Sequence, residues 1–194
     1  MPPRHERVEF WKHAYARASF IDAQIFLEDL LSQKPEGFSP LRKLFTIAIL
    51  TLYARPFKQR RPVRLENEVI PIEHKQVHDW TIEHRDKVVA HRDLHAAVTT
   101  WGFINQLRLV TDQVGFTIHT LSPYMPDEMA QELLALVKIL IQTMEERTKP
   151  FLENYFRLPS VAPGEYVMNL KDETPPRWLE PAPRGEVYLL GTPK

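Results

Sequence analysis

Apolar side chains follow a helical period over the first part of the chain. From about Glu6 to Gln33 they recur every three or four residues, which predicts an amphipathic helix. The residues that follow, KPEG from Lys34 to Gly37, end this pattern because proline and glycine break helices.

A second helix is predicted directly afterwards. Ser39 and Pro40 have the residue types of an N-cap and a first helical position. The next segment, LRKLFTIAILTLYAR, is apolar on most of its surface, so we expect it in the middle of a helix bundle. It should end near Arg55, because Pro56 disfavours helical geometry in the residue before it.

The last long helix is predicted to begin at Pro126–Asp127 and to reach about Phe156 on a broad apolar face. Pro150 should bend or interrupt it. From Pro159 onward the chain is rich in proline and has little periodicity, so we expect an extended or disordered arm over residues 159–194.

Two interpretations fit the region before this helix. The β-prone runs Gln106–Val110 and Phe116–Thr120 flank a polar, glycine-containing connection, which predicts a small β-hairpin at about residues 105–121. A helix through Ala96–Leu109 is the competing interpretation. The expected fold is thus mainly α: an antiparallel helix bundle over residues 1–158, with the hairpin and the arm.

Composition narrows the function classes. The 194 residues carry 25 Lys+Arg and 25 Asp+Glu, so a broad electropositive coat for nucleic acid is excluded and an anion site must be a local concentration of charge. There are no cysteines, which excludes thiolate metal sites and cysteine nucleophiles. The most apolar window, Leu44–Tyr53, is too short to span a bilayer. We expect a cytoplasmic, soluble protein without a membrane association and without a cofactor.

Candidate chemistry gathers between Pro71 and His95, in PIEHKQVHDWTIEHRDKVVAHRDLH. This stretch holds five of the eight histidines, and Pro71 offers a first-turn proline for a helix. On a straight helix the side chains form two stripes. The stripe expected towards solvent or a partner holds His74, His78, Arg85 and Arg92, and the stripe expected towards the core holds Val77, Trp80, His84, Val88, His91 and His95.

Arg85 and His91 fall about 120° apart on this helical wheel. They could flank one groove, but they could grip one atom only through a helix distortion or a second copy of the helix. The preceding loop, from Phe57 to Val69, is basic and irregular. It is either a solvated loop or a phosphate-facing flap beside the histidine helix.

Two i, i+4 histidine pairs, His74/His78 and His91/His95, have the spacing that lets imidazoles share a metal ion, but no H-E-x-x-H motif occurs. We therefore predict no metal site. The aromatic residues Trp11, Tyr15, Trp80 and Trp101 could stack on bases, although their helical spacing is typical of core positions.

The segment RDKVVAHRD, beginning at Arg85, resembles the R-x(4–6)-H signature of HEPN domains, helical bundles found in many RNases of bacterial toxin and defence systems. The element YARPF, from Tyr53 to Phe57, resembles one associated with such proteins. The resemblance covers roughly Ile47 to Asp93.

The resemblance implies metal-independent cleavage of RNA by a homodimer, with two motif copies sharing one cleft. His91 would transfer a proton, Arg85 would hold the phosphate, and Asp86 would orient either residue. Candidate substrate-binding residues are His78, Arg92, Lys58 and Arg60. RNA or a protein partner such as an antitoxin is expected. In the alternative interpretation, the motif is structural and the chain is a non-catalytic binding module.

Overall fold

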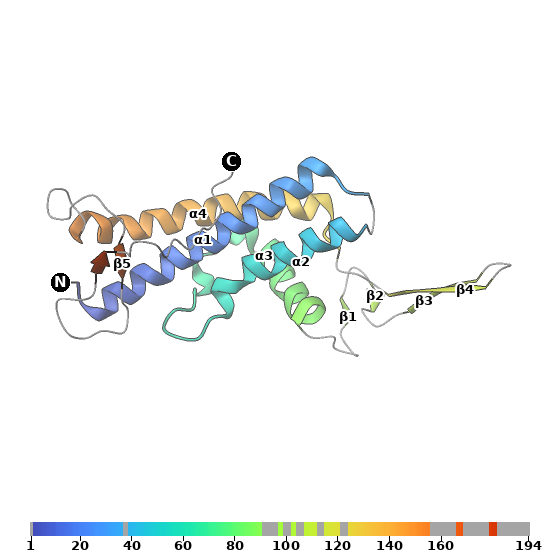
Figure 1. Cartoon of the computed structure of the whole chain (residues 1–194), viewed down its shortest axis with the longest axis horizontal. Coiled ribbons are helices and arrows are strands. Elements are labelled where there is room, and N and C mark those ends of the chain that lie inside the picture. The colour runs from blue at the N-terminus through green and yellow to red at the C-terminus, as the bar shows by residue number, and fades with distance from the viewer. Residues whose placement is uncertain are drawn as a thin grey trace.

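The computed structural model is mainly helical (Figure 1). It describes residues 2–36, 39–90, 97–98, 102–103, 107–111, 115–120, 124–155, 166–168 and 179–181. The predicted mainly α class is therefore confirmed. In this part of the chain, no helix is both long and apolar enough to cross a membrane.

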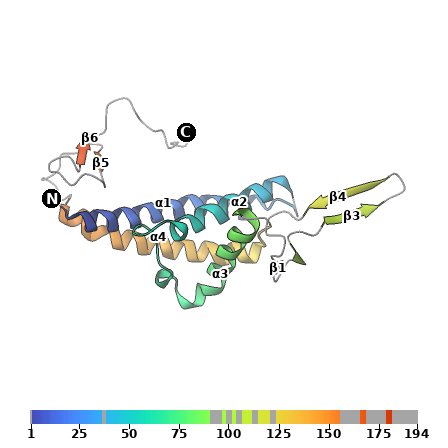
Figure 2. The ribbon, with the colours of Figure 1, turned by 90° about the horizontal axis from the view of Figure 1, so that it is seen from below.

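The longest helices, α1 (Arg4–Gln33) and α4 (Asp127–Tyr155), lie side by side along the whole body (Figures 1 and 2). Their side-chain contacts pair the beginning of one helix with the end of the other, so the helices are antiparallel. Tyr155 donates a hydrogen bond to Glu6, and Lys138 forms an ion pair with Glu28. Both helices were predicted from their apolar periodicity, to within a few residues.

Helix α2 (Pro40–Ala54) packs on α1 and carries the most apolar sequence. Its start is as predicted: the Ser39 Oγ accepts a hydrogen bond from the backbone N–H of Arg42 at 3.2 Å. A short 3₁₀ turn, η1 (Arg55–Lys58), follows at the expected Pro56 boundary.

A buried arginine joins the starts of α2 and α4. Arg42 is 4% exposed and donates hydrogen bonds to the Met125 carbonyl at 2.8 and 3.2 Å and to the Pro35 carbonyl at 3.1 Å. It also pairs with Asp127 and stacks on the Tyr124 ring. The sequence gives no hint of this role, because Arg42 occupies an ordinary first-turn position.

Several short helical segments follow α2 in the chain. The chain passes through η2 (Asn67–Val69) and η3 (Ile72–His74) into α3 (Lys75–His84), and then into the π-helical turn η4 (Arg85–Ala90). Helix α3 and η4 both pack against α2. The hydrophobic core is shared by all four α-helices, with Phe20, Ile49, Val77 and Leu136 among its buried members.

Short antiparallel strand pairs complete the described chain: β1 (Ala97–Val98) with β2 (Gly102–Phe103), β3 (Leu107–Thr111) with β4 (Phe116–Thr120), and β5 (Tyr166–Met168) with β6 (Leu179–Pro181). In β3 and β4, Leu107 lies opposite Thr120. These two strands extend away from the bundle (Figures 1 and 2). Most of the predicted arm, residues 159–194, lies outside the described residues.

Pro150 was expected to bend or interrupt α4. It does not interrupt the helix, because α4 runs through it to Tyr155. Pro150 removes only one backbone donor and is exposed near the helix end, so the packing of Phe151 on Phe10 (ring centroids 4.4 Å apart) can hold the last turn.

Candidate functional site

The histidine stretch is not one straight helix. It starts as the 3₁₀ turn η3, continues as α3 and changes into the π-helical turn η4 at Arg85. The consecutive β-branched residues Val88 and Val89 within this turn weaken the preference for α-helix. The 120° angle between Arg85 and His91 therefore no longer applies, because it assumes a regular α-helix. His91, Arg92 and His95 lie outside the described residues.

His78 joins the histidine stretch to the YARPF element. Its Nδ1 lies 2.7 Å from the hydroxyl of Tyr53, and the Phe57 ring meets the imidazole edge-on at 4.8 Å between centroids. His78 is 2% exposed, and this burial lowers its pKa to about 4. The predicted orientation of His78 towards solvent or a partner is wrong. The buried face of α3 is broader than the predicted stripe: it also includes Thr81, which lies one helical turn from both Val77 and His78.

His84 takes the core-facing position that was predicted. Its ring stacks on Trp80 with centroids 3.8 Å apart, and its Nδ1 donates to the Trp80 carbonyl at 2.9 Å. Burial lowers its pKa. His84 is thus a neutral, hydrogen-bonded side chain of the bundle.

A cluster of opposite charges occupies the beginning of η4. The Arg85 Nη1 donates to Asp86 Oδ1 at 2.9 Å, and Lys58 Nζ donates to Asp86 Oδ2 at 2.5 Å. All three side chains are about one-third exposed. Partial burial acts to raise the Asp86 pKa, but the hydrogen bonds from Lys58 and Arg85 outweigh it and the pKa is lowered. Asp86 is consequently an anion that fixes Arg85, and not a proton donor near neutral pH.

Arg85 retains unused donors. A guanidinium carries five N–H groups, and within the described chain only Nη1 of Arg85 donates to a side chain. Because Asp86 already orients the group, a phosphate could be bound through the remaining N–H groups at little cost in side-chain entropy.

Next to this cluster a cleft of about 640 Å³ lies between α3 and the loop that precedes it. His78 and Ile82 line it from α3, and Phe57 lines it from η1. Two cations and four carboxylates also line it: Lys58, Arg64, Glu66, Glu68, Asp79 and Glu83. The cleft is thus net acidic, which disfavours a phosphate inside it.

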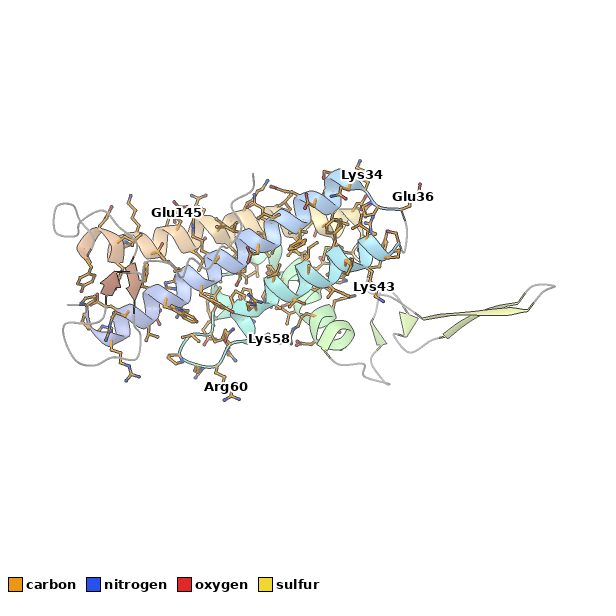
Figure 3. The ribbon with its side chains drawn as sticks, viewed as in Figure 1. Lys34, Glu36, Lys43, Lys58, Arg60 and Glu145 are labelled. Atoms are coloured by element: carbon orange, nitrogen blue, oxygen red, sulfur yellow. The ribbon has the colours of Figure 1, made fainter. Side chains whose placement is uncertain are left out.

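The structure brings some of the predicted site residues together and separates others. Lys58, Asp86 and Arg85 are joined by hydrogen bonds, and His78 lines the cleft beside them. Arg60 is exposed and points away from the bundle (Figure 3). The link from Lys58 to Asp86 was missed, although the proline-containing turn after Ala54 is a signal that the basic loop folds back.

The described residues contain no cluster of three or more histidine and carboxylate side chains able to hold a metal ion. In the pair His74/His78, the second ring is already bonded to Tyr53. The pair His91/His95 lies outside the described residues.

No protein-family model matches the chain, and no significant similarity was found to curated proteins or to solved structures.

Proposed function

We propose that the protein is a HEPN-like, metal-independent ribonuclease of the toxin or defence type. The observation that carries this proposal is Arg85 of η4, which is about one-third exposed, is held by Asp86 and keeps further N–H donors, directly before the segment that contains His91. An arginine fixed in this way is suited to binding a phosphodiester and to stabilising the charge of its transition state.

The proposed reaction is an attack of the RNA 2′-hydroxyl on the adjacent phosphorus atom. The bond to the 5′-oxygen breaks, leaving a 2′,3′-cyclic phosphate and a free 5′-hydroxyl. His91 takes the proton of the nucleophile or gives one to the leaving oxygen. Arg85 binds the phosphate oxygens, and Asp86 positions Arg85. A homodimer supplies the same groups twice to one shared cleft.

The π-helical geometry of η4 supports this assignment. Single π-helical turns inside α-helices occur frequently at functional sites, because they change the direction of side chains at a cost in helix stability. Here the turn spans Arg85–Ala90, the part of the motif between the two residues that the chemistry needs.

Cleavage of a labelled single-stranded RNA in EDTA tests the proposal. We expect cyclic phosphate products from the wild type and a loss of rate of at least a hundredfold in Arg85→Ala and His91→Ala. Arg147→Ala, an exposed arginine of α4, is the matched control and should cleave normally. Circular dichroism must show the same helical content in all variants. Cleavage that survives both active-site substitutions, or that needs added metal, contradicts the mechanism.

The shared cleft has its own test. Arg85→Ala and His91→Ala chains are mixed, unfolded in urea and refolded together, so that mixed dimers form. Recovery of part of the activity would show that one site can use groups from two copies. Mixed dimers that remain inactive would contradict the shared cleft.

A non-catalytic helical module that binds a protein or a nucleotide is the second candidate. It is favoured by His78 and His84, whose rings serve the packing of the bundle. In that case the wild type cleaves no RNA, and the only effect of Arg85→Ala is a lower midpoint of thermal unfolding.

A further inference from the structure

An aromatic pair on α1 lies outside the hydrophobic core. Trp11 and Tyr15 stack on each other with centroids 4.9 Å apart and planes inclined by 10°. Both side chains are half-buried, and neither belongs to the core cluster. The helical spacing of these residues is typical of core positions, but here the pair keeps part of its surface exposed.

Residues near this pair in the chain, and on the loop that Gln59 joins to Tyr15, include three cations. Lys12 is its neighbour on α1, and the loop after η1 adds the exposed Arg60 and Arg61. Within the described chain Arg60 has no ion-pair partner, and it points away from the bundle (Figure 3). The nearest counter-charges are Glu9, which pairs with Lys12, and Glu66, which lies 3.7 Å from Arg61.

The loop and α1 are close in space. A hydrogen bond from Arg64 lowers the pKa of Glu66, and the charges of Arg61 and Lys12 lower it further. The hydrogen bond from Gln59 to the Tyr15 hydroxyl places the loop beside this part of α1. We name this surface the aromatic–basic surface: Trp11, Lys12, Tyr15, Arg60 and Arg61.

Two consecutive residues connect this surface to the candidate site. Gln59 donates a hydrogen bond from Nε2 to the Tyr15 hydroxyl at 3.1 Å. Lys58, its neighbour in the chain, donates to Asp86. Consecutive Cα atoms are about 3.8 Å apart. The dipeptide Lys58–Gln59 therefore contacts the Arg85–Asp86 pair through one side chain and the aromatic pair through the other.

Charge distinguishes the two approaches to Arg85. The cleft beside α3 carries more carboxylates than cations. The three cations of the aromatic–basic surface, by contrast, are accompanied by two carboxylates, Glu9 and Glu66. A polyanion is repelled by the first and attracted by the second.

We propose that the aromatic–basic surface binds single-stranded RNA and leads it to Arg85, with one base stacked on the Trp11–Tyr15 pair. This rests on the proposed ribonuclease function and names the form of its substrate. Aromatic side chains beside cations bind single strands because every unpaired base offers a face for stacking. Bases within a duplex are already stacked, so a duplex can use only the cations.

The test is fluorescence anisotropy with a labelled uridine 12-mer whose 2′-hydroxyls are methylated, which prevents cleavage. The same strand paired with its complement serves as the duplex probe. We expect Trp11→Ala to weaken single-strand binding at least fivefold. Arg60→Gln should weaken binding and flatten its dependence on salt concentration. Lys34→Gln changes a lysine at the far end of α1 (Figure 3) and should bind as the wild type does.

The stacking role is checked by Trp11→Phe, which keeps an aromatic face and should recover most of the binding. If Trp11→Ala does not fold, this variant and Arg60→Gln still decide the question. Wild-type affinity in Trp11→Ala and Arg60→Gln, or equal affinity for the duplex, overturns the inference. If Arg85→Ala still abolishes cleavage in that case, the proposed function stands without this surface. A wild type that neither binds nor cleaves RNA overturns both.

Discussion

The buried imidazole of His78 makes the stability of the protein depend on pH. Its pKa lies at about 4 in the folded chain, against 6.5 for a free histidine, because burial disfavours the charged ring. Among nearby charges, Asp79 acts in the opposite direction, while Lys75 and Lys58 lower the pKa further. Between these two pH values the unfolded chain binds a proton at His78 and the folded chain does not.

The sign follows from this difference. Where the unfolded state binds more protons, the free energy of unfolding rises with pH, so stability is lost as pH falls from 6.5 towards 4. Integrating from pH 7 to pH 5 with a folded pKa of about 4 gives a loss of about 2 kcal/mol from His78 alone. His13, whose pKa is also lowered to about 4, chiefly by burial, adds a similar loss.

Urea unfolding followed by circular dichroism at pH 7 and at pH 5 measures the effect. We expect His78→Asn to lose about 2 kcal/mol less than the wild type between the two pH values. Tyr53→Phe is the matched control: it deletes the hydroxyl partner but keeps His78 buried, so the pH dependence should remain. Equal pH dependence in His78→Asn and the wild type would refute the reasoning, as would a His78 Cε1–H resonance that titrates near 6.5 in the folded protein.

Three further substitutions test the packing of the bundle by thermal and urea unfolding. Arg42→Ala should destabilise the protein by roughly 3 kcal/mol, because the Met125 carbonyl and Asp127 lose a buried, charged donor; an unchanged midpoint would contradict this role. Ser39→Ala should cost about 1 kcal/mol through the lost N-cap, whereas Ser39→Asp should cost little. Pro150→Ala should stabilise the protein by roughly 1–3 kcal/mol, because α4 already runs through this exposed position; a lower midpoint would show that the proline is required there.

Much of the bundle could be predicted because local signals and burial agree. Two of these signals are local: the spacing of apolar residues in α1 and α4, and the Ser39–Pro40 start of α2. The structure has these helices where the sequence predicts them. The role of Arg42 could not be predicted, because its partners come from the start of α4, 83 residues further along the chain. From the sequence alone, an arginine in the first turn of a helix cannot be distinguished from a surface residue. The distinction requires knowing which other element packs against it.

The site was harder to predict, because the helical wheel assumes one regular helix. The buried face of α3 extends through Thr81 to His78, which the predicted stripe of large apolar residues left exposed, and regular α-helical geometry ends where the π-helical turn begins at Arg85. The family resemblance implied that Asp86 orients Arg85 or His91, and Asp86 accepts a hydrogen bond from Arg85 at 2.9 Å. The second partner, Lys58, depends on how the loop folds back.

The zero net charge of the chain excludes a broad basic coat, yet it does not oppose an RNA-binding surface of limited size. The structure separates the charges around Lys58. Towards α3, four carboxylates line the cleft, and towards α1 the loop carries the exposed cations Arg60 and Arg61. A strand of RNA responds to the potential within about a Debye length, roughly 8 Å at physiological salt, and not to the total charge. A chain of zero net charge can therefore attract a polyanion on one side of Lys58 and repel it on the other, because its charges are unevenly distributed.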